Sequence, residues 1–420
     1  MFPVKPKKIQ SIYLDHAAAT PLEKQVFESM KPYFSSDFAN PSALYSLGVK
    51  AKKKVEEARK KVAEIVFTQP DTIYFTSGGT EANNVALFGV IEELKTRKRE
   101  SEKTKKHIIT TKIEHDSVLR PIQELEKQGV DVTYLDVDEI GLVNVEDVKK
   151  ALRKETILVS IMYANNEIGT IEPIAEIGRE ILKWRKNNKT SFPYFHTDAC
   201  QAANYLELSV EKLHVDLLTL NGSKIYGPKG VGVLYKRRGV ALSPQSFGGR
   251  QERGLRAGTE NVPGIIGFSK ALDLVQKKKE KENVRMEKLR NYFWESIEKN
   301  IPDVFVNGPG LENKKARKQE STAPTNRLPS NLNVYFKDVE AEALILYLDS
   351  YGISCSSGSA CSTESNEPSH VLKACGMSDE RSFGSIRFSL GKDTTKKDID
   401  RVMKYLPGIV EELRKTTKVQ

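Results

Sequence analysis

Short apolar runs alternate with amphipathic segments from Tyr13 to about Asn261. Apolar runs of this length between turn residues are typical of buried strands. The predicted strands cover residues 72–76, 107–111, 130–135, 156–163, 194–197, 217–220 and 232–235. The segments between them that have helical spacing cover residues 41–66, 82–95, 118–128, 145–152 and 175–187. This alternation predicts an α/β fold with a mostly parallel sheet flanked by helices.

The pattern changes after a long helical segment at residues 264–300. Residues 312–327 are polar, charged and without periodicity, which predicts a flexible surface loop. The strands predicted in this part cover 331–336 and 385–389, and the helices cover 340–351, 369–375 and 396–415. We therefore expect a large domain over residues 13–263 and a smaller α+β domain over residues 264–420, with residues 1–12 packed near the smaller one.

Composition narrows the class of protein. The 420 residues are 39% hydrophobic and 29% charged. No apolar stretch approaches the roughly 18 residues that a membrane span requires, and the N-terminus lacks the apolar core of a secretory signal. Four irregularly spaced cysteines fit neither a disulfide framework nor a standard zinc site. We therefore expect a cytoplasmic protein without a bound metal.

The net charge of +10 raises the question of a nucleic-acid partner. Much of the excess lies in dispersed runs at residues 95–106, 277–281 and 314–318, without interleaved aromatic residues. Charged runs at helix ends and in loops are usually solvated surface. Direct binding of nucleic acid is therefore not expected.

Two charged residues, Asp198 and Lys224, each lie at the end of an apolar run. Open α/β sheets bind their ligands at the carboxyl ends of the strands. Pyridoxal phosphate chemistry needs an amine that forms a Schiff base and an acid that keeps the pyridine nitrogen protonated. For either residue alone, a surface position is the simpler interpretation. Together they predict a pyridoxal phosphate site, and the rest of that site should lie nearby.

Three further turns follow predicted strands. Residues 76–81 (Thr-Ser-Gly-Gly-Thr-Glu) open a helix, and glycine backbone with free helix N–H groups suits a phosphate. His115 carries a ring that suits stacking on a cofactor and proton transfer. The Asn-rich turn at 164–169 offers side-chain amides to a carboxylate or a cofactor oxygen. An ordinary βα turn, an exposed histidine and a structural Asn turn are the alternatives.

Two more candidates lie toward the C-terminus. Cys361 lies in the small, polar sequence 354–362, where an exposed thiol would act as a nucleophile. Arg387 interrupts the predicted strand 385–389, and its guanidinium suits a carboxylate ligand, with an internal salt bridge as the alternative. The cysteines predicted to be structural are Cys200, Cys355 and Cys375.

In their order and combination, these motifs resemble those of the cysteine desulfurases, pyridoxal phosphate enzymes of fold type I in the class V aminotransferase group. The motifs lie at residues 14–20, 76–81, 114–115, 165–167, 198–201, 224–230, 256–259, 357–361 and 387. The resemblance covers nearly the whole chain, from about Tyr13 to Lys415. It implies a fold type I transferase that removes sulfur from L-cysteine, releases L-alanine and forms a persulfide.

The resemblance also implies a role for each matching residue. Lys224 would form the Schiff base, Asp198 would pair with the pyridine nitrogen, and His115 would stack on the ring and act in catalysis. Cys361 would accept the sulfur. The other cofactor contacts would be Gly79, Thr80, Asn166, Gln201, Asn221, Ser223 and, from the neighbouring subunit of a homodimer, Thr259. The substrate carboxylate would be bound by Arg387, Asn166 and Asn40.

The loop at 354–368 is as long as in desulfurases that pass sulfur to proteins, which implies an acceptor in iron–sulfur cluster assembly or tRNA thiolation. Ser223 stands where the family usually has His before the Schiff-base lysine, so we expect weaker cofactor anchoring. A selenocysteine lyase or another class V enzyme is the alternative among enzymes, and an inactive scaffold subunit is the alternative outside them. The residues that argue against a scaffold are Lys224, Asp198, His115, Cys361 and Arg387.

Overall fold

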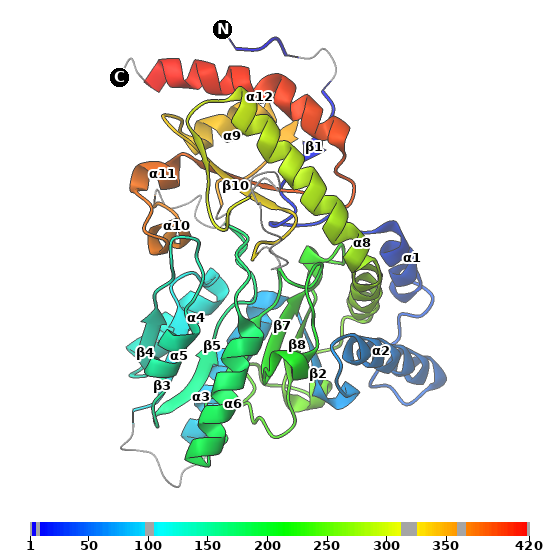
Figure 1. Ribbon diagram of the computed structural model, residues 1–420. Helices are drawn as coiled ribbons and strands as arrows, with labels where there is room; N and C mark the ends of the chain where they lie inside the picture. The colour runs from blue at the N-terminus through cyan, green and yellow to red at the C-terminus, as the bar shows by residue number, and fades with distance from the viewer. Residues whose placement is uncertain (1, 6–8, 97–104, 312–325, 359–366, 418–420) are drawn as a thin grey trace.

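The computed structural model describes residues 2–5, 9–96, 105–311, 326–358 and 367–417 (Figure 1). Its centre is a seven-stranded sheet in the order β2-β8-β7-β6-β5-β3-β4. The strands are β2 Ile73–Thr76, β3 His107–Thr111, β4 Asp131–Leu135, β5 Thr156–Ser160, β6 Tyr194–Asp198, β7 Leu217–Asn221 and β8 Gly232–Lys236. β8 runs antiparallel to both of its neighbours, and the other neighbouring pairs are parallel. The predicted mostly parallel sheet is therefore confirmed.

Successive side chains on these strands enter two different hydrophobic cores. Ile108 and Leu158 join the core on one face, whereas the next residues, Ile109 and Val159, join the core on the other. The first face is covered by α3 Gly79–Thr96 and α4 Asp116–Lys127. The second is covered by α2 Ser46–Ile65, α5 Val145–Ala151, α6 Ile174–Asn188 and the start of α8 Val262–Asn300. Burial of both faces explains why apolar residues occupy successive positions in several of these strands, such as β5 and β8.

A further core surrounds a three-stranded antiparallel sheet in the order β12-β10-β9. Its strands are β9 Val304–Val306, β10 Asn331–Phe336 and β12 Ser385–Ser389. The helices in this part are α9 Ala341–Asp349, α10 His370–Ala374, α11 Asp379–Phe383 and α12 Lys396–Thr417. Helix α8 runs from one part to the other, with its start in the large core and its end in this one (Figure 1). The domain boundaries at residues 13, 263 and 264 stay predictions.

Several short elements have too little periodicity to be predicted from the sequence. They are β1 Ile12–Tyr13, α1 Lys24–Met30, α7 Val210–Leu213, β9, β11 Ile353–Ser354 and α11. β1 pairs with β11 in parallel, so two segments more than 300 residues apart lie side by side. This pairing holds the segment after β1 between the two parts of the fold.

The predicted surface loop at 312–327 is wrong at its C-terminal end. Residues 312–325 lie outside the described residues, but Arg327 is fully buried. Its Nε donates to the Pro309 carbonyl at 2.9 Å, and Nη2 donates to the Asn307 carbonyl. Burial and the nearby Arg290 lower the pKa of Arg327 to about 9. The burial of Arg327 could not be predicted from the composition of the segment. Its guanidinium is satisfied by backbone carbonyls, which leave no signal in the sequence.

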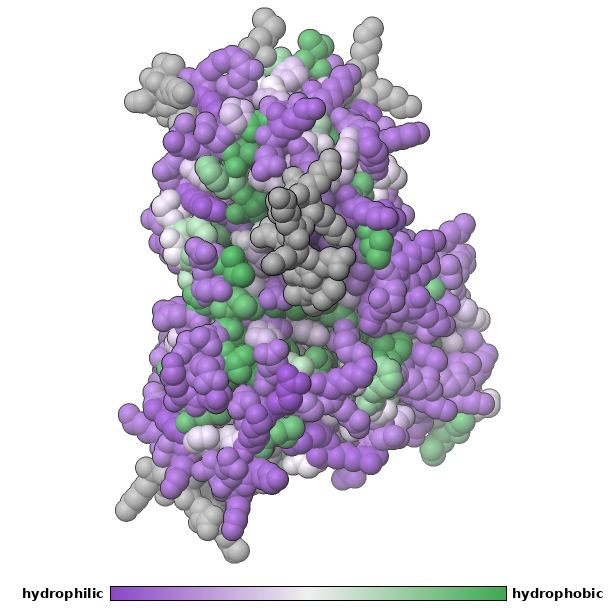
Figure 2. Space-filling model, viewed as in Figure 1, coloured by the Kyte–Doolittle hydropathy of each residue, from purple (hydrophilic) through white to green (hydrophobic). Residues whose placement is uncertain are grey.

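The face of the molecule in Figure 2 is mostly hydrophilic, with hydrophobic residues scattered over it. Exposed large hydrophobic side chains are nevertheless frequent around α1 and the start of α2. They include Phe27, Phe34, Phe38, Leu44 and Tyr45. Among the described helices, none is long and apolar enough to cross a membrane.

A buried ion pair joins α2 to the loop that precedes α8, and we expect it to matter for stability. Both terminal nitrogens of Arg59 donate to Glu252 at 2.8 Å, and the Phe75 N–H donates to the same carboxylate at 2.9 Å. Glu252→Ala should lower the free energy of unfolding by about 3 kcal/mol, because it leaves the buried Arg59 without its buried partner and with only the exposed Glu56 at 3.1 Å. Urea unfolding measures this loss.

The matched control is Glu64→Ala, which removes an exposed carboxylate paired with Lys61. Exposed pairs contribute about 0–1 kcal/mol, so this variant should unfold close to the parent chain. Equal losses for the two variants would contradict the stabilising role of the Arg59–Glu252 pair.

Candidate active site

A cavity of about 230 Å³ lies at the carboxyl edge of the seven-stranded sheet. It collects residues that directly follow the parallel strands, as expected for an open α/β sheet. The predicted site residues that line it are Gly79, Thr80, His115, Asn166, Asp198, Gln201, Asn221, Lys224 and Arg387. Residues scattered over the sequence are therefore brought to one place.

Lys224 follows β7 and lies in a short helical turn, Gly222–Lys224. Its Nζ donates to the carbonyl oxygens of Ala17 and Ala18 at 2.9 and 2.5 Å. Gln201 Nε2 donates to the same Ala17 carbonyl at 3.0 Å. Burial lowers the pKa of Lys224, so a larger share of its amine is neutral than in an exposed lysine.

Asp198 is the last residue of β6 and is buried. Its Oδ1 accepts from the Cys200 N–H at 2.9 Å, and its Oδ2 accepts from Asn83 Nδ2 at 2.7 Å. Both oxygens thus accept hydrogen bonds, as an ionised carboxylate does. The prediction that Cys200 is only structural is incomplete, because this buried residue also lines the cavity.

The turn at 76–81 forms the start of helix α3. Gly79 and Thr80 line the cavity, and the first N–H groups of a helix have no partner within it. The Glu81 carboxylate stabilises the turn. Its Oε2 accepts from the Ser77 N–H at 2.7 Å, and its Oε1 pairs with Arg256 at 3.1 Å. The turn therefore offers backbone donors and a positive helix end to an anion in the cavity.

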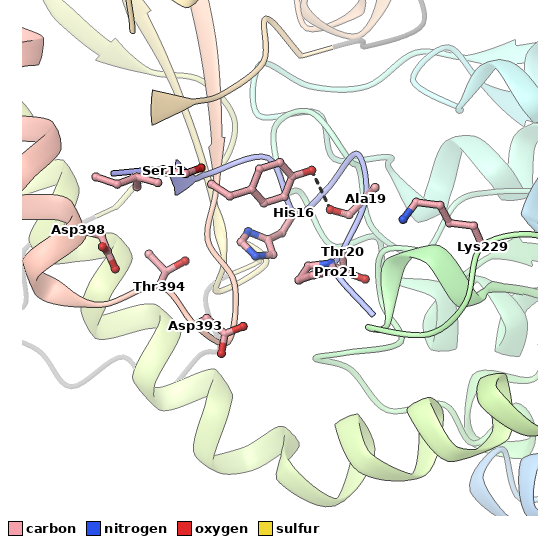
Figure 3. Close-up of a pocket in the computed structure, with 11 residues that line it drawn as sticks. Ser11, His16, Ala19, Thr20, Pro21, Lys229, Asp393, Thr394 and Asp398 are labelled. Carbon is pink, nitrogen blue, oxygen red and sulfur yellow. Dashed lines mark hydrogen bonds between the residues drawn. The ribbon is translucent and has the colours of Figure 1, made fainter. Parts of the chain in front are cut away.

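A larger hollow, of about 460 Å³, lies on another side of the segment that follows β1 (Figure 3). Its lining includes His16, Thr20, Lys229, Asp393 and Asp398, and the Tyr13 hydroxyl at its edge donates to the Ala19 carbonyl at 2.9 Å. None of the predicted site residues lines it. The smaller cavity is therefore the better candidate for catalysis.

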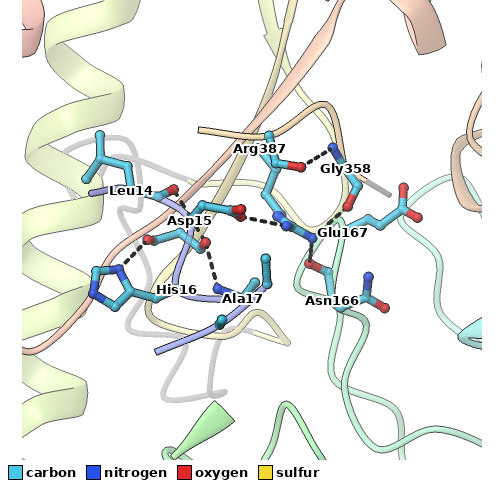
Figure 4. A network of polar contacts seen from close by, with 12 residues as sticks. Leu14, Asp15, His16, Ala17, Asn166, Glu167, Gly358 and Arg387 are labelled. Atoms are coloured by element: carbon cyan, nitrogen blue, oxygen red, sulfur yellow. Dashed lines mark hydrogen bonds and ion pairs between the residues drawn. The ribbon is translucent and has the colours of Figure 1, made fainter. Parts of the chain in front are cut away.

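Arg387 is buried in β12, and its partners lie in the same chain (Figure 4). Its Nη2 pairs with Asp15 Oδ1 at 2.7 Å, and its Nη1 donates to the Asn166 and Gly358 carbonyls at 3.0 and 2.6 Å. Its Nε is buried and has no partner among the described residues. The internal salt bridge is thus present, while the unsatisfied Nε keeps the carboxylate-binding role as a prediction.

Other predicted residues do not line the cavity of this chain. Asn40 and Thr259 are exposed, and Asn40 Oδ1 accepts from the Ser42 N–H at 2.9 Å. Ser223 accepts two hydrogen bonds from Thr20 at its backbone carbonyl. Cys361 lies outside the described residues. The roles implied for these four residues stay predictions.

Sequence reasoning assigned no role to several residues in or behind the cavity, although one of them, Glu167, lies in the predicted turn 164–169. They are Ser117, Glu167 and His370, together with Asn83 behind Asp198. Glu167 Oε2 accepts from the Ser369 hydroxyl at 2.6 Å, and His370 Nε2 bonds the Glu114 carbonyl at 2.9 Å. The sequence carries one signal for this part of the site. Asn83 is a polar residue among the apolar positions of α3 that are buried.

Glu114 precedes His115, contacts the cavity residue Met162 and is fully buried. Its Oε1 accepts from the Thr111 hydroxyl and the Met162 N–H, both at 2.8 Å, while Oε2 has no partner among the described residues. Burial raises the pKa of Glu114 to about 8. The folded chain therefore holds a proton here that the unfolded chain releases near pH 4.3.

This difference predicts that Glu114 lowers stability as the pH rises. Below about pH 4 both states are protonated and this contribution is fully present; between about pH 4 and 8 only the folded state keeps the proton, so stability falls as the pH rises and the contribution is lost above about 8. Glu114→Gln stays neutral, so its loss of unfolding free energy between pH 6 and pH 9 should be smaller by about 1–3 kcal/mol. Urea unfolding at both pH values tests this, with the exposed Glu139→Gln as control. The same pH dependence in both variants would contradict the prediction.

The three described cysteines carry free thiols. Burial raises the pKa of Cys200 and of Cys355, and it raises the pKa of Cys375 to about 12. Cys355 packs against the smaller core, and Cys375 lies in a small cluster with Ile168 and Val371. The described residues contain no cluster suited to a metal ion.

Comparisons with known proteins agree with this arrangement. The aminotransferase class-V family matches residues 12–402. The cysteine desulfurase IscS of Dictyoglomus turgidum is 48% identical over 405 residues, which cover 96% of this chain and 96% of that protein. A solved NifS-like protein superposes with a TM-score of 0.82 at 34% identity, covering 98% of this chain and 100% of its own. The structure of SspA in complex with cysteine gives a TM-score of 0.73 at 34% identity, covering 90% of this chain and 98% of its own. The predicted fold is confirmed, and the chain belongs to the cysteine desulfurases of the aminotransferase class-V family.

Proposed function

We propose that this chain uses pyridoxal phosphate to remove sulfur from L-cysteine, releases L-alanine and carries the sulfur as a persulfide on Cys361. The observation that carries the proposal is the single cavity lined by Lys224, Asp198, His115 and Arg387. Family membership supports the reaction class. The cysteine bound by the similar protein SspA supports the choice of substrate.

The chemistry of the cavity fits pyridoxal phosphate. Lys224 offers an amine whose partners are backbone carbonyls, and Asp198 offers a carboxylate for the ring nitrogen. The start of α3 at Gly79 and Thr80 offers donors for the phosphate. Arg387 Nε is a buried donor that still needs an acceptor. When bound, the cofactor supplies an electron sink for the bond broken at the substrate Cα.

Further residues would complete the binding of cofactor and substrate. His115 would stack on the ring, and Gln201, Asn166 and Asn221 would hydrogen-bond it. Ser223 would donate its hydroxyl to the phosphate, in the position where the family usually has His. Arg387 with Asn166 and Asn40 would hold the substrate carboxylate.

Lys224 and Cys361 carry out different steps of the proposed reaction. Lys224, kept partly neutral by burial, takes the proton from the substrate Cα. Cys361 attacks as a thiolate, so that an S–S bond forms while the C–S bond of the substrate breaks. The three-carbon product takes up one proton at Cβ and regains one at Cα, matching the protons given up by the Cys361 thiol and taken by Lys224, and leaves as alanine. One sulfur atom thus passes from L-cysteine to Cys361, and no external oxidant or reductant is needed.

The proposal includes a homodimer and a protein that accepts the sulfur. Thr259 and Asn40 are exposed and lie outside the cavity of their own chain, so a second subunit would bring Thr259 to the phosphate. The exposed Phe34, Phe38 and Leu44 offer apolar surface for that contact. The acceptor would belong to iron–sulfur cluster assembly or tRNA thiolation, in the cytoplasm.

The direct experiment is to measure alanine released from L-cysteine by the purified protein, with and without added pyridoxal phosphate. We expect a yellow protein that releases alanine from L-cysteine and not from L-serine, which carries no sulfur. A colourless protein that binds no added pyridoxal phosphate would contradict the proposal and favour a scaffold subunit.

A further inference from the structure

A chain of buried hydrogen bonds joins His115 to Asp198 through two residues with no role so far. His115 Nδ1 lies 2.8 Å from Ser117 Oγ, and Asn83 Nδ2 donates to Ser117 Oγ at 2.9 Å. The same Asn83 amide donates to Asp198 Oδ2 at 2.7 Å. His115 and Asp198 lie after different strands, so this chain of contacts ties together two sides of the cavity.

The donor and the acceptor in each hydrogen bond follow from the groups at the two ends, which are the Ser117 backbone N–H and the Asp198 carboxylate. The Ser117 backbone N–H donates to His115 Nδ1 at 3.0 Å, and a backbone N–H has no other option than to donate. His115 Nδ1 is therefore an acceptor, and the proton of the neutral ring lies on Nε2. At the other end, the Asp198 carboxylate accepts, so Asn83 must turn its NH₂ group toward it.

Ser117 links the two ends in the middle of the chain. Because Asn83 donates to Ser117 Oγ, the hydroxyl proton of Ser117 is free to point at His115 Nδ1. The one lone pair of the imidazole nitrogen is then shared between two donors, the backbone N–H and the hydroxyl. Within the described ranges, His115 Nε2 has no hydrogen-bond partner, so its N–H remains available to a molecule in the cavity.

The buried amide of Asn83 lowers the stability of the folded chain. Asn83 is fully buried, and its Oδ1 has no hydrogen-bond partner among the described residues. A buried acceptor without a partner opposes folding, so packing alone would favour an apolar residue at this position of α3. The two hydrogen bonds that Asn83 makes are the feature that an apolar residue would lose.

We propose that Asn83 and Ser117 are positioning residues that hold His115 as its Nε2–H tautomer and tie its ring to Asp198. In this state His115 is a hydrogen-bond donor to the contents of the cavity. Proton abstraction is then left to Lys224, whose pKa burial lowers. The tautomer is a property of the chain alone. The assignment of hydrogen-bond donation to His115 and of proton abstraction to Lys224 rests on the proposed function.

Nitrogen-15 NMR of the histidine-labelled holoenzyme tests the tautomer, because protonated and unprotonated ring nitrogens resonate far apart. His115→Gln identifies the His115 signals among the six histidines. We expect an unprotonated Nδ1 and a protonated Nε2 in the parent chain. In Ser117→Ala, Nδ1 keeps only the backbone hydrogen bond, and in Asn83→Ala the Ser117 hydroxyl is no longer held toward Nδ1. A measurable share of the Nδ1–H tautomer should therefore appear in both variants, and Ser117→Thr, which keeps the hydroxyl, should restore the parent spectrum.

Ser209→Ala is the matched control. Ser209 is also a buried serine, but it caps helix α7 and does not line the cavity. This variant should leave the His115 signals unchanged. A protonated Nδ1 in the parent chain, or identical His115 signals in the parent, Ser117→Ala and Asn83→Ala, would overturn the proposal.

Kinetics separate this proposal from the proposed function. Ser117→Ala should lower kcat for alanine release about tenfold with little change in KM, the order expected when one hydrogen bond donated by His115 Nε2–H is partly lost. The expected tautomer in a protein that releases no alanine would overturn only the proposed function. Normal kcat in Ser117→Ala together with an unchanged tautomer would overturn only the positioning role.

Discussion

Lys224→Ala is expected to abolish both cofactor attachment and alanine release. The amine is partly buried, its partners are two backbone carbonyls, and it is placed at the carboxyl edge of the sheet with Asp198. An alanine offers neither an amine for the cofactor nor a base for the Cα proton. We expect activity to fall by roughly 10³-fold or more, as when an enzyme loses its nucleophile or base.

Absorbance of the cofactor and alanine release measure this loss. Lys229→Ala is the matched control, because it removes an exposed lysine five residues further along the same turn. The apo-protein gives a second readout. Because burial lowers the pKa of Lys224, the rate of cofactor loading should reach its plateau at a lower pH than the reaction of an exposed lysine. Normal colour and turnover in Lys224→Ala would contradict the assignment.

Cys361→Ala is expected to keep the colour of the protein and lose persulfide formation, again with a loss of roughly 10³-fold or more in turnover. The other three thiols are poor candidates, because burial raises the pKa of each. A thiol that stays protonated is a weak nucleophile. The variant leaves Lys224, Asp198 and the phosphate turn unchanged, so cofactor binding should persist.

Cys375→Ala controls for the loss of a thiol, because Cys375 is buried in the small cluster with Ile168 and Val371 and does not line the cavity. It should retain turnover. Persulfide and alanine are measured together on the same samples. Normal turnover in Cys361→Ala, or equal losses in the two variants, would place the sulfur acceptor elsewhere.

The main elements of the fold were predictable because most of the long helices and central strands carry a local signal. Buried strands such as β5 and β7 are mostly apolar runs, since both faces of the sheet are covered. Short elements such as β1 depend on a distant partner, here β11, and carry no period of their own. The burial of Arg327 has the same origin, because the carbonyls that satisfy it come from residues 307 and 309.

The candidate site was predictable where each residue follows a strand in a recognisable turn. Lys224, Asp198 and His115 are of this kind, and they line one cavity. The partners that orient them were not predictable. Asp15 meets Arg387, and Asn83 meets Asp198, across separations of 372 and 115 residues. Such contacts are set by the tertiary structure and leave no spacing pattern in the sequence.

The central claim is that one sulfur atom passes from L-cysteine to Cys361. A single turnover without reductant tests it most directly: L-cysteine is added to the holoenzyme, alanine is quantified, and the cysteine-containing peptides are analysed by mass spectrometry. The account predicts about one alanine per subunit and one additional sulfur atom on the peptide that carries Cys361. Alanine without that additional sulfur, or a persulfide on Cys200, Cys355 or Cys375 instead, would contradict it.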